Sequence, residues 1–191
     1  MGRIIISENS TIDGVGQDPT GDEGFDRGGW FQRVAEADRA AWAAAEAAEA
    51  ESAAALLLGR RSYDWFAGRW SVRTGAWADR LRALPKHVVT SRPLDATWAN
   101  STVLDGDPID AITTLKTTVD GDIVVYANHG LIPALFDHGL VDEVRLMVFP
   151  FVLGDGPRLF GHTGLAAGPL RLVGTRAVGD GIARLTYRCV R

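Results

Sequence analysis

Residues 53–66 read AAALLLGRRSYDWF, an apolar run that stops at Gly59 and gives way to a mixed polar and aromatic segment. The run Ala53–Leu58 predicts a buried strand, and Arg60–Phe66 predicts a short helix. A glycine between a strand and a helix lets backbone N–H groups approach an anion, and the helix dipole favours negative charge there. Read alone, the segment is equally typical of a tight strand–helix turn with a solvated basic face.

The same alternation of strand and helix extends in both directions along the chain. Apolar or β-branched runs predict further strands at 3–7, 87–90, 102–104, 122–126 and 144–149. Alanine-rich or capped segments predict helices at 31–52, 76–84, 108–119 and 130–137. Strands alternating with helices indicate an α/β fold with a mostly parallel sheet covered on both faces. Gly179-Asp180-Gly181 separates two further strands, so a C-terminal antiparallel hairpin is expected at one edge.

Length and composition indicate the general class of protein. The 191 residues suit a single domain spanning 1–191. A net charge of −4 argues against nucleic acid as the main partner, which would favour a basic face. Cys189 is the one cysteine and cannot form an intrachain disulfide, and no Cys/His cluster has zinc spacing. No apolar run approaches the ~20 residues needed to span a bilayer, and the first residues do not resemble a signal peptide. We therefore expect a cytoplasmic protein without a metal or a membrane partner.

Ligands of open α/β sheets bind outside the carboxyl ends of the strands, which directs attention to three places. Directly after the strand 53–58, Gly59, Arg60 and Ser62 offer backbone N–H groups, a guanidinium and a hydroxyl to a phosphate. After Val89, the run Thr90-Ser91-Arg92 suits the 2′-phosphate that distinguishes NADPH from NADH. Ser-Arg-Pro is also ordinary turn chemistry.

The third strand end carries Ala127, Asn128, His129, Gly130 and Leu131, where another helix is expected to begin. Free N–H groups at that helix start form a second candidate anion site, and His129 is a candidate phosphate contact or acid. A histidine at a helix start is more often only a neighbour of the cap. No G-x-G-x-x-G follows the first strand and no Walker A lysine is present, which argues against a common Rossmann enzyme and an NTPase.

Two stretches carry a family resemblance that covers nearly the whole chain. LLLGRRSYDWF resembles the strand–GR–[ST]-[YW]–helix segment of dihydrofolate reductases. Residues 122–160, including GLVDE at 139–143 and VLGDGPRLF at 152–160, strongly resemble the reductase (C-terminal) domain of the bacterial bifunctional riboflavin-biosynthesis deaminase/reductase. Ile12-Asp13-Gly14 fits that family's exit from the first strand. The sequence contains no H-x-E or P-C-x-x-C zinc motif, so it carries no deaminase half.

This resemblance implies a three-layer αβα sandwich, NADPH as cofactor, and reduction of a pterin-like or pyrimidine-like heterocycle. It also implies a homodimer. By resemblance, the cofactor residues at the three strand ends are Gly59, Arg60, Ser62, Thr90, Ser91, Arg92, Ala127, Asn128, His129, Gly130 and Leu131. One departure concerns Ala127-Asn128, where many relatives carry Gly-Ser or a glycine pair. An alanine adds a methyl group where the backbone approaches the ligand.

Reduction of a C=N bond also needs a proton donor. Dihydrofolate reductases place an acid on the helix before the GR segment, and the candidates there are Asp38, Glu46 and Glu49. Asp13 is a further candidate because it leaves the first strand near the expected nicotinamide. We rank Asp13 first and Asp38 second; a turn-forming role for Asp13 and solvated positions for the helix carboxylates are the alternatives.

Aromatic residues and a glycine provide the candidate substrate contacts Trp30, Phe149 and Gly154. Trp30 and Phe31 end the loop 14–29 and suit stacking on a flat heterocycle or a hydrophobic staple for the helix. Trp65 and Trp70 are expected to pack in the core or under a lid. Because fold does not fix function, a non-catalytic ligand-binding protein or a dimeric scaffold on the same fold remains the alternative to a reductase.

Overall fold

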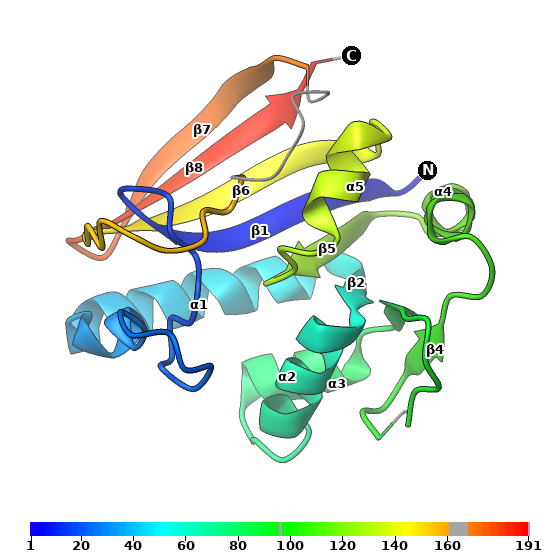
Figure 1. The fold of residues 1–191 in the computed structure, drawn as a ribbon, viewed down its shortest axis with the longest axis horizontal. Helices are drawn as coiled ribbons and strands as arrows, with labels where there is room; N and C mark the ends of the chain where they lie inside the picture. The colour runs from blue at the N-terminus through cyan, green and yellow to red at the C-terminus, as the bar shows by residue number, and fades with distance from the viewer. Residues whose placement is uncertain (96, 161–167, 191) are drawn as a thin grey trace.

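A computed structural model describes residues 1–95, 97–160 and 168–190. Its strands are β1 (Arg3–Thr11), β2 (Ala53–Gly59), β3 (Lys86–Val89), β4 (Ser101–Val103), β5 (Asp122–Tyr126), β6 (Val141–Phe149), β7 (Leu170–Val178) and β8 (Ile182–Cys189). They form a single sheet in the order β4-β3-β2-β5-β1-β6-β8-β7 (Figure 1). Neighbours from β4 to β6 run parallel, whereas β8 is antiparallel to both β6 and β7.

Five α-helices and one 3-10 helix connect the strands. They are η1 (Trp30–Arg33), α1 (Glu36–Ser52), α2 (Arg60–Trp70), α3 (Ala76–Ala83), α4 (Pro108–Thr118) and α5 (Ile132–Asp137), counted over the described residues. Figure 1 shows α1, α2 and α3 together on one side of the sheet and α4 and α5 away from them. Within the described chain, every helix is too short or too polar to cross a membrane.

The alternation of side chains along the strands produces a core on each face of the sheet. Ile4 and Ile6 pack with α4 and α5, whereas Ile5 between them packs with α1, α2 and α3. The three isoleucines have no exposed surface, so β1 is covered on both faces. The predicted mostly parallel sheet with helices on both faces and a terminal antiparallel hairpin is confirmed.

Among the predicted elements that differ from the structure in extent, β1 and the helix 31–52 differ most. β1 continues to Thr11 because it pairs with β6 along its length, beyond the apolar run that ends at Ser7. The predicted helix 31–52 is divided into η1 and α1 because Val34 and Ala35 adopt extended backbone. The division lets Val34 and Trp30 enter the core while α1 takes a separate direction.

Asp18 organises the loop between β1 and η1. Its carboxylate accepts hydrogen bonds from the backbone N–H groups of Asp22 (2.8 Å) and Phe25 (3.2 Å), and its carbonyl accepts from Gly21 and Gly29. The side chain is almost fully buried. Asp22 and Glu23 then pair with Arg69 (2.6 Å) and Arg61 (2.8 Å) on α2. The loop is therefore an ordered segment fastened to α2.

Candidate active site

A cavity of about 520 Å³ lies at the carboxyl ends of β1, β2, β3 and β5. These four strands are parallel, so their ends share one edge of the sheet, as expected for a ligand site in this fold class. The walls also include residues of α1, α2, α3 and the loop that Asp18 organises. Its size is that of a small-molecule site.

One end of the cavity is a cradle of backbone and small side chains formed by Gly59, Ser62, Ala127 and Asn128. The Ser62 hydroxyl donates to the Ala127 carbonyl at 2.6 Å and ties α2 to the end of β5. A Cβ at position 59 would lie 2.8 Å from Asn128 Oδ1, which explains why this position is glycine. α2 begins directly after Gly59, so its free N–H groups lie at this end.

Ala127 adopts a left-handed backbone conformation with φ of 46°, which is unfavourable for an alanine. Two contacts hold it there. Ser62 binds its carbonyl, and the next N–H, that of Asn128, donates to Glu8 Oε1 at 2.9 Å. The end of β5 thus keeps a glycine-like backbone under strain at an alanine.

The basic residues near this end already have partners. Arg60 pairs with Asp64 at 2.8 Å and donates to the Pro93 carbonyl, and Arg61 pairs with Glu23. Both line the cavity. Thr90 closes a small turn by accepting from the Arg92 N–H and donating to its carbonyl. Thr90, Ser91 and Arg92 lie outside the cavity wall, which Val89 forms at this strand end.

The third predicted cofactor segment lines the cavity, although α5 begins later than expected. Ala127, Asn128, His129, Gly130 and Leu131 all contribute to the wall. Burial lowers the pKa of His129 below its usual value, so this side chain is neutral at pH 7. α5 begins at Ile132, and the Asn128 carbonyl, not its side chain, accepts the first N–H groups of that turn.

Two buried carboxyl groups face the cavity, Glu8 from β1 and Glu46 from α1. Burial raises the pKa of Glu8 to about 8, although the Asn128 N–H opposes the change. Burial also raises the pKa of Glu46 to about 8, and the negative charge of Glu49 adds to the effect. Carboxyl groups that keep a proton near neutral pH are characteristic of acid–base sites.

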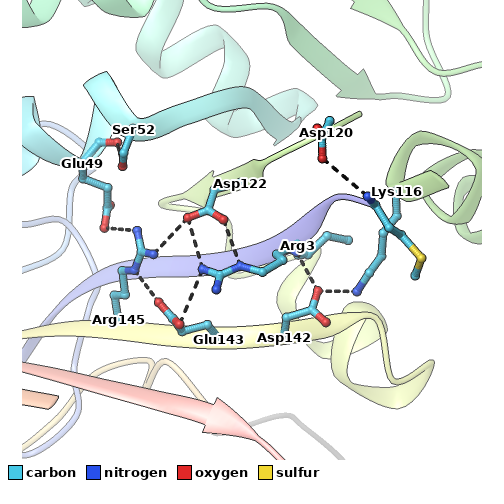
Figure 2. A network of polar contacts seen from close by, with 11 residues as sticks. Arg3, Glu49, Ser52, Lys116, Asp120, Asp122, Asp142, Glu143 and Arg145 are labelled. Atoms are coloured by element: carbon cyan, nitrogen blue, oxygen red, sulfur yellow. Dashed lines mark hydrogen bonds and ion pairs between the residues drawn. The ribbon is translucent and has the colours of Figure 1, made fainter. Parts of the chain in front are cut away.

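A network of ion pairs fixes the charge of Glu49 behind the cavity. Glu49 Oε2 accepts from Arg145 at 2.9 Å and from Arg184 at 2.7 Å. Figure 2 shows Arg145 between Glu49, Asp122 and Glu143, with Arg3 beside the last two. The negative charge of Glu49 opposes ionisation of Glu46 one helical turn away.

The two acids ranked first from the sequence are engaged in structural contacts. Asp13 accepts from the Thr11 hydroxyl (2.7 Å) and the Gly154 N–H (2.7 Å), and these bonds lower its pKa. Asp38 accepts from the Asp180 N–H at 2.7 Å and anchors the β7–β8 turn. Neither lines the cavity, so this geometry favours the helix acid Glu46, the next candidate along α1.

The three predicted substrate contacts also lie away from the cavity wall. Trp30 and Phe149 have no exposed surface and pack edge to face at 5.2 Å. The Trp30 indole N–H donates to the Gln17 carbonyl and so holds the loop against the core. Gly154 has a positive φ of 81° and donates its N–H to Asp13. These residues therefore support the segments from which the walls are built.

Sequence reasoning missed Glu8 and underrated the tryptophans. Trp42, Trp65, Trp70 and Trp77 line the cavity, although Trp65 and Trp70 were expected in the core or under a lid. Glu8 offered one signal, a carboxylate two residues after the apolar run Ile4–Ile6 in the same strand. The tryptophans offered a weaker signal, since their meeting depends on how three helices pack.

Comparison with known proteins places this geometry in a family. A family model described as the RibD C-terminal domain matches residues 3–184. The chain belongs to the RibD C-terminal domain family. The resemblance stated from GRRSYDWF and VLGDGPRLF is therefore confirmed. Among curated relatives of this family, the uncharacterized protein YyaP of Bacillus subtilis (strain 168) is 28% identical over 139 residues, 69% of this chain and 72% of that protein.

Solved structures extend the comparison to the whole fold. A protein named for riboflavin biosynthesis, from Shewanella sp. PV-4, has a TM-score of 0.71 at 18% identity and covers 99% of both chains. A second structure is the diaminohydroxyphosphoribosylaminopyrimidine deaminase/5-amino-6-(5-phosphoribosylamino)uracil reductase of Thermotoga maritima. Its TM-score is 0.64 at 13% identity, and the match covers 99% of this chain and 57% of that one.

Dihydrofolate reductase from Enterococcus faecalis, complexed with NADP(H), gives a TM-score of 0.59 at 14% identity, over 99% of this chain and 97% of that one. At this level of identity the likeness concerns the fold. The predicted dihydrofolate reductase-like fold is therefore confirmed, and the RibD C-terminal domain family is an instance of it.

Proposed function

We propose that this protein is an NADPH-dependent oxidoreductase that reduces a small heterocyclic substrate of pterin-like or pyrimidine-like type. One observation carries the proposal. A single cavity joins the cradle around Gly59 and Ser62 to two buried carboxyl groups that hold protons near pH 7. Dinucleotide binding needs the first feature, and proton transfer to a reduced ring needs the second.

The residues present fit a dinucleotide. Gly59 leaves room for the Asn128 side chain beside the start of an eleven-residue helix, and both residues line the cavity. In the proposal Gly59, Arg60 and Ser62 serve the phosphates, and Thr90, Ser91 and Arg92 beside the cavity hold the adenosine 2′-phosphate. Ala127, Asn128, His129, Gly130 and Leu131 line the pyrophosphate and nicotinamide side.

NADPH supplies the hydride when bound. The chain supplies orientation and the proton. Glu46 would donate its proton to the nitrogen of a substrate C=N bond and would be left as a carboxylate. Solvent then returns the proton to Glu46. Glu8 holds the Asn128 N–H and keeps the strained peptide at Ala127 in place.

Titration with NADPH, read by tryptophan fluorescence, tests the cofactor. Binding at sub-millimolar concentrations is expected because three tryptophans of α1 and α2 line the cavity. No binding in that range would rule the proposal out. Oxidation of NADPH across a panel of pterins and pyrimidinones then identifies substrates.

The pH dependence of kcat tests Glu46 as the acid. A general acid must be protonated to act. We therefore expect kcat to be constant below pH 8 and to fall as the pH rises through about 8. Glu46→Gln should lower kcat by about 100-fold or more. The matched control is Glu51→Gln on the same helix, whose side chain is 68% exposed. An unchanged kcat in Glu46→Gln would assign the proton to another group.

The alternative candidate is a ligand-binding protein without turnover, and one observation favours it. Ala127 lines the cavity with a left-handed backbone, and its methyl group stands where the family resemblance leads us to expect a glycine. Tight NADPH binding with no oxidation of NADPH by any member of the substrate panel would support this alternative.

The proposal also covers the oligomeric state of the protein and its place in the cell. Two copies associate through β7, the outermost strand of the sheet, which exposes Leu170, Leu172 and Val173. An edge strand with exposed apolar residues favours pairing with another chain. We place the enzyme, a single domain over residues 1–191, in the cytoplasm, where Cys189 stays reduced.

A further inference from the structure

Tyr126 ends β5, directly before the strained residue Ala127, and its side chain is buried. It lines the cavity, as Glu46 does. The ring of Phe66 on α2 is tilted against the tyrosine ring, with 6.1 Å between the ring centroids. Tyr126 also shares a buried cluster with Ala50, which follows Glu46 by four residues on α1. The tyrosine ring is therefore held between the sheet and the helix face that carries Glu46.

Two buried polar atoms in this region lack partners. Neither the Tyr126 hydroxyl on β5 nor Glu49 Oε1 on α1 has a partner within hydrogen-bonding distance among the described residues. A tyrosine hydroxyl can donate one hydrogen bond, and a carboxylate oxygen can accept one. Buried polar groups of native proteins are almost always hydrogen-bonded, so a buried hydroxyl without a partner calls for an explanation.

The charges around Tyr126 keep its hydroxyl protonated. Burial, and then the negative charges of Glu49 and Glu46, raise the pKa of Tyr126 well above its usual value, whereas Arg145 opposes the change. The hydroxyl is therefore available as a hydrogen-bond donor near pH 7. A donor beside two carboxyl groups on one turn of a helix favours whichever of them carries the greater negative charge.

Other charged groups also surround Glu46, and they come from four elements. They are Glu49 on α1, Glu8 on β1, Arg145 on β6 and Arg184 on β8. Both arginines donate to Glu49 Oε2. The Tyr126 hydroxyl, by contrast, is a donor still free to serve a Glu46 carboxylate.

We propose that Tyr126 is a positioning residue for Glu46, and that its hydroxyl donates a hydrogen bond to the carboxylate that proton transfer leaves on Glu46. The inference rests on the proposed function and adds the group that stabilises the ionised acid. The proton lost by Glu46 goes to the substrate nitrogen, and Tyr126 keeps its own. While Glu46 is protonated, the O–H group of Tyr126 is directed to Glu49 Oε1.

Titration of the Glu46 carboxyl group in Tyr126→Phe tests the inference without cofactor or substrate. The infrared band of the protonated carboxyl group, assigned by its loss in Glu46→Gln, is followed as the pH is raised. A hydrogen bond to the ionised form lowers the pKa of an acid, so Glu46 in the variant should titrate about one unit higher than in the parent. Tyr187→Phe, on β8 and outside the cavity wall, is the matched control and should titrate like the parent.

Kinetics separate a positioning role from a purely structural one. Tyr126→Phe should lower kcat by about ten-fold below pH 8, leave KM unchanged and move the fall of kcat to higher pH. In the Glu46→Gln background the same change should have no further effect on kcat, because Tyr126 acts through Glu46. An equal loss of kcat in both backgrounds would assign Tyr126 a structural role and overturn the inference.

Tyr126→Phe retains the ring and removes a hydroxyl that has no partner among the described residues, so the variant should fold. An unchanged titration of Glu46 in this variant, with NADPH oxidised by the parent, overturns the inference and leaves the proposed function intact. A raised titration in protein that does not bind NADPH supports the hydrogen bond from Tyr126 to Glu46 and overturns the proposed function.

Discussion

Ala127 combines an unfavourable backbone conformation with a position at the centre of the site. Its carbonyl and the following N–H are both taken by other elements, so the backbone cannot relax without breaking a hydrogen bond to Ser62 or Glu8. Strained residues of this kind persist where the surrounding structure determines them, and they gather at functional sites.

Ala127→Gly is therefore expected to stabilise the protein, because glycine adopts a positive φ without the alanine penalty. A gain of about 1 kcal/mol in the free energy of unfolding is expected in urea titrations. Ala67→Gly, within α2, is the matched control and should lose about 1 kcal/mol. A destabilised Ala127→Gly variant would contradict the assignment of strain.

Single residues were the hardest scale to predict from the sequence. Gly59 and Ser62 could be expected beside a cavity at the strand end because a strand–glycine–helix pattern is local. Glu8 was missed because its burial depends on an N–H donor 120 positions away, at Asn128. Asp13 was ranked first from its place at a strand exit, yet it also accepts from the backbone N–H groups of the distant residues 153 and 154.

At the scale of elements, the loop between β1 and η1 depends on close packing around Asp18. A Cβ at Gly28 would lie 2.5 Å from Asp18 Oδ2, which leaves no space for a larger residue. The sequence identified this loop only as long and rich in glycine. Its order comes from one buried carboxylate and two ion pairs to α2, which no local pattern contains.

Gly28→Ala should displace Asp18 and release the loop, at a cost of about 1 kcal/mol or more in the free energy of unfolding. Trypsin should then cleave after the exposed Arg27 faster than in the parent protein. Gly68→Ala is the matched control, since its Cβ meets open space within α2, and it should gain up to about 1 kcal/mol. Equal cleavage rates in Gly28→Ala and the parent would contradict this role of Asp18.

Helices and strands were well predicted where the apolar run or the helix-forming segment is long. The exceptions have a physical cause in tertiary packing. Alanine propensity favoured one helix over 31–52, but burial of Trp30 and Val34 favoured a break before α1. The contacts between the rings of Trp42, Trp70 and Trp77 could not be predicted from the sequence, because the packing of three helices decides which rings meet.

At the scale of the whole molecule, the sheet is covered at its centre and open at one edge. β8 is hydrogen-bonded on both sides, whereas β7 has one strand neighbour, and eight of its nine residues are exposed. Leu172 is 50% exposed and Val173 is 44% exposed. Natural proteins protect such edges with charge or cover them with another chain.

A double change of Leu172 and Val173 to lysine should prevent the proposed association by placing charge on the edge. Light scattering coupled to size exclusion should give twice the 20.5 kDa chain mass for the parent and the chain mass for the variant. Val72→Lys is the control, since Val72 is 79% exposed in the segment between α2 and α3. A parent protein that elutes as a monomer at all concentrations would contradict the dimer.

The ion pairs around Glu49 have a consequence for synthesis of the chain. Glu49 is in α1, Arg145 is in β6 and Arg184 is in β8, the last strand. A nascent chain on the ribosome therefore holds Glu49 without its second guanidinium until β8 has emerged. Burial of an incompletely paired carboxylate is unfavourable, so the helix that carries Glu46 and Trp42 should settle against the sheet only after β8 has been synthesised.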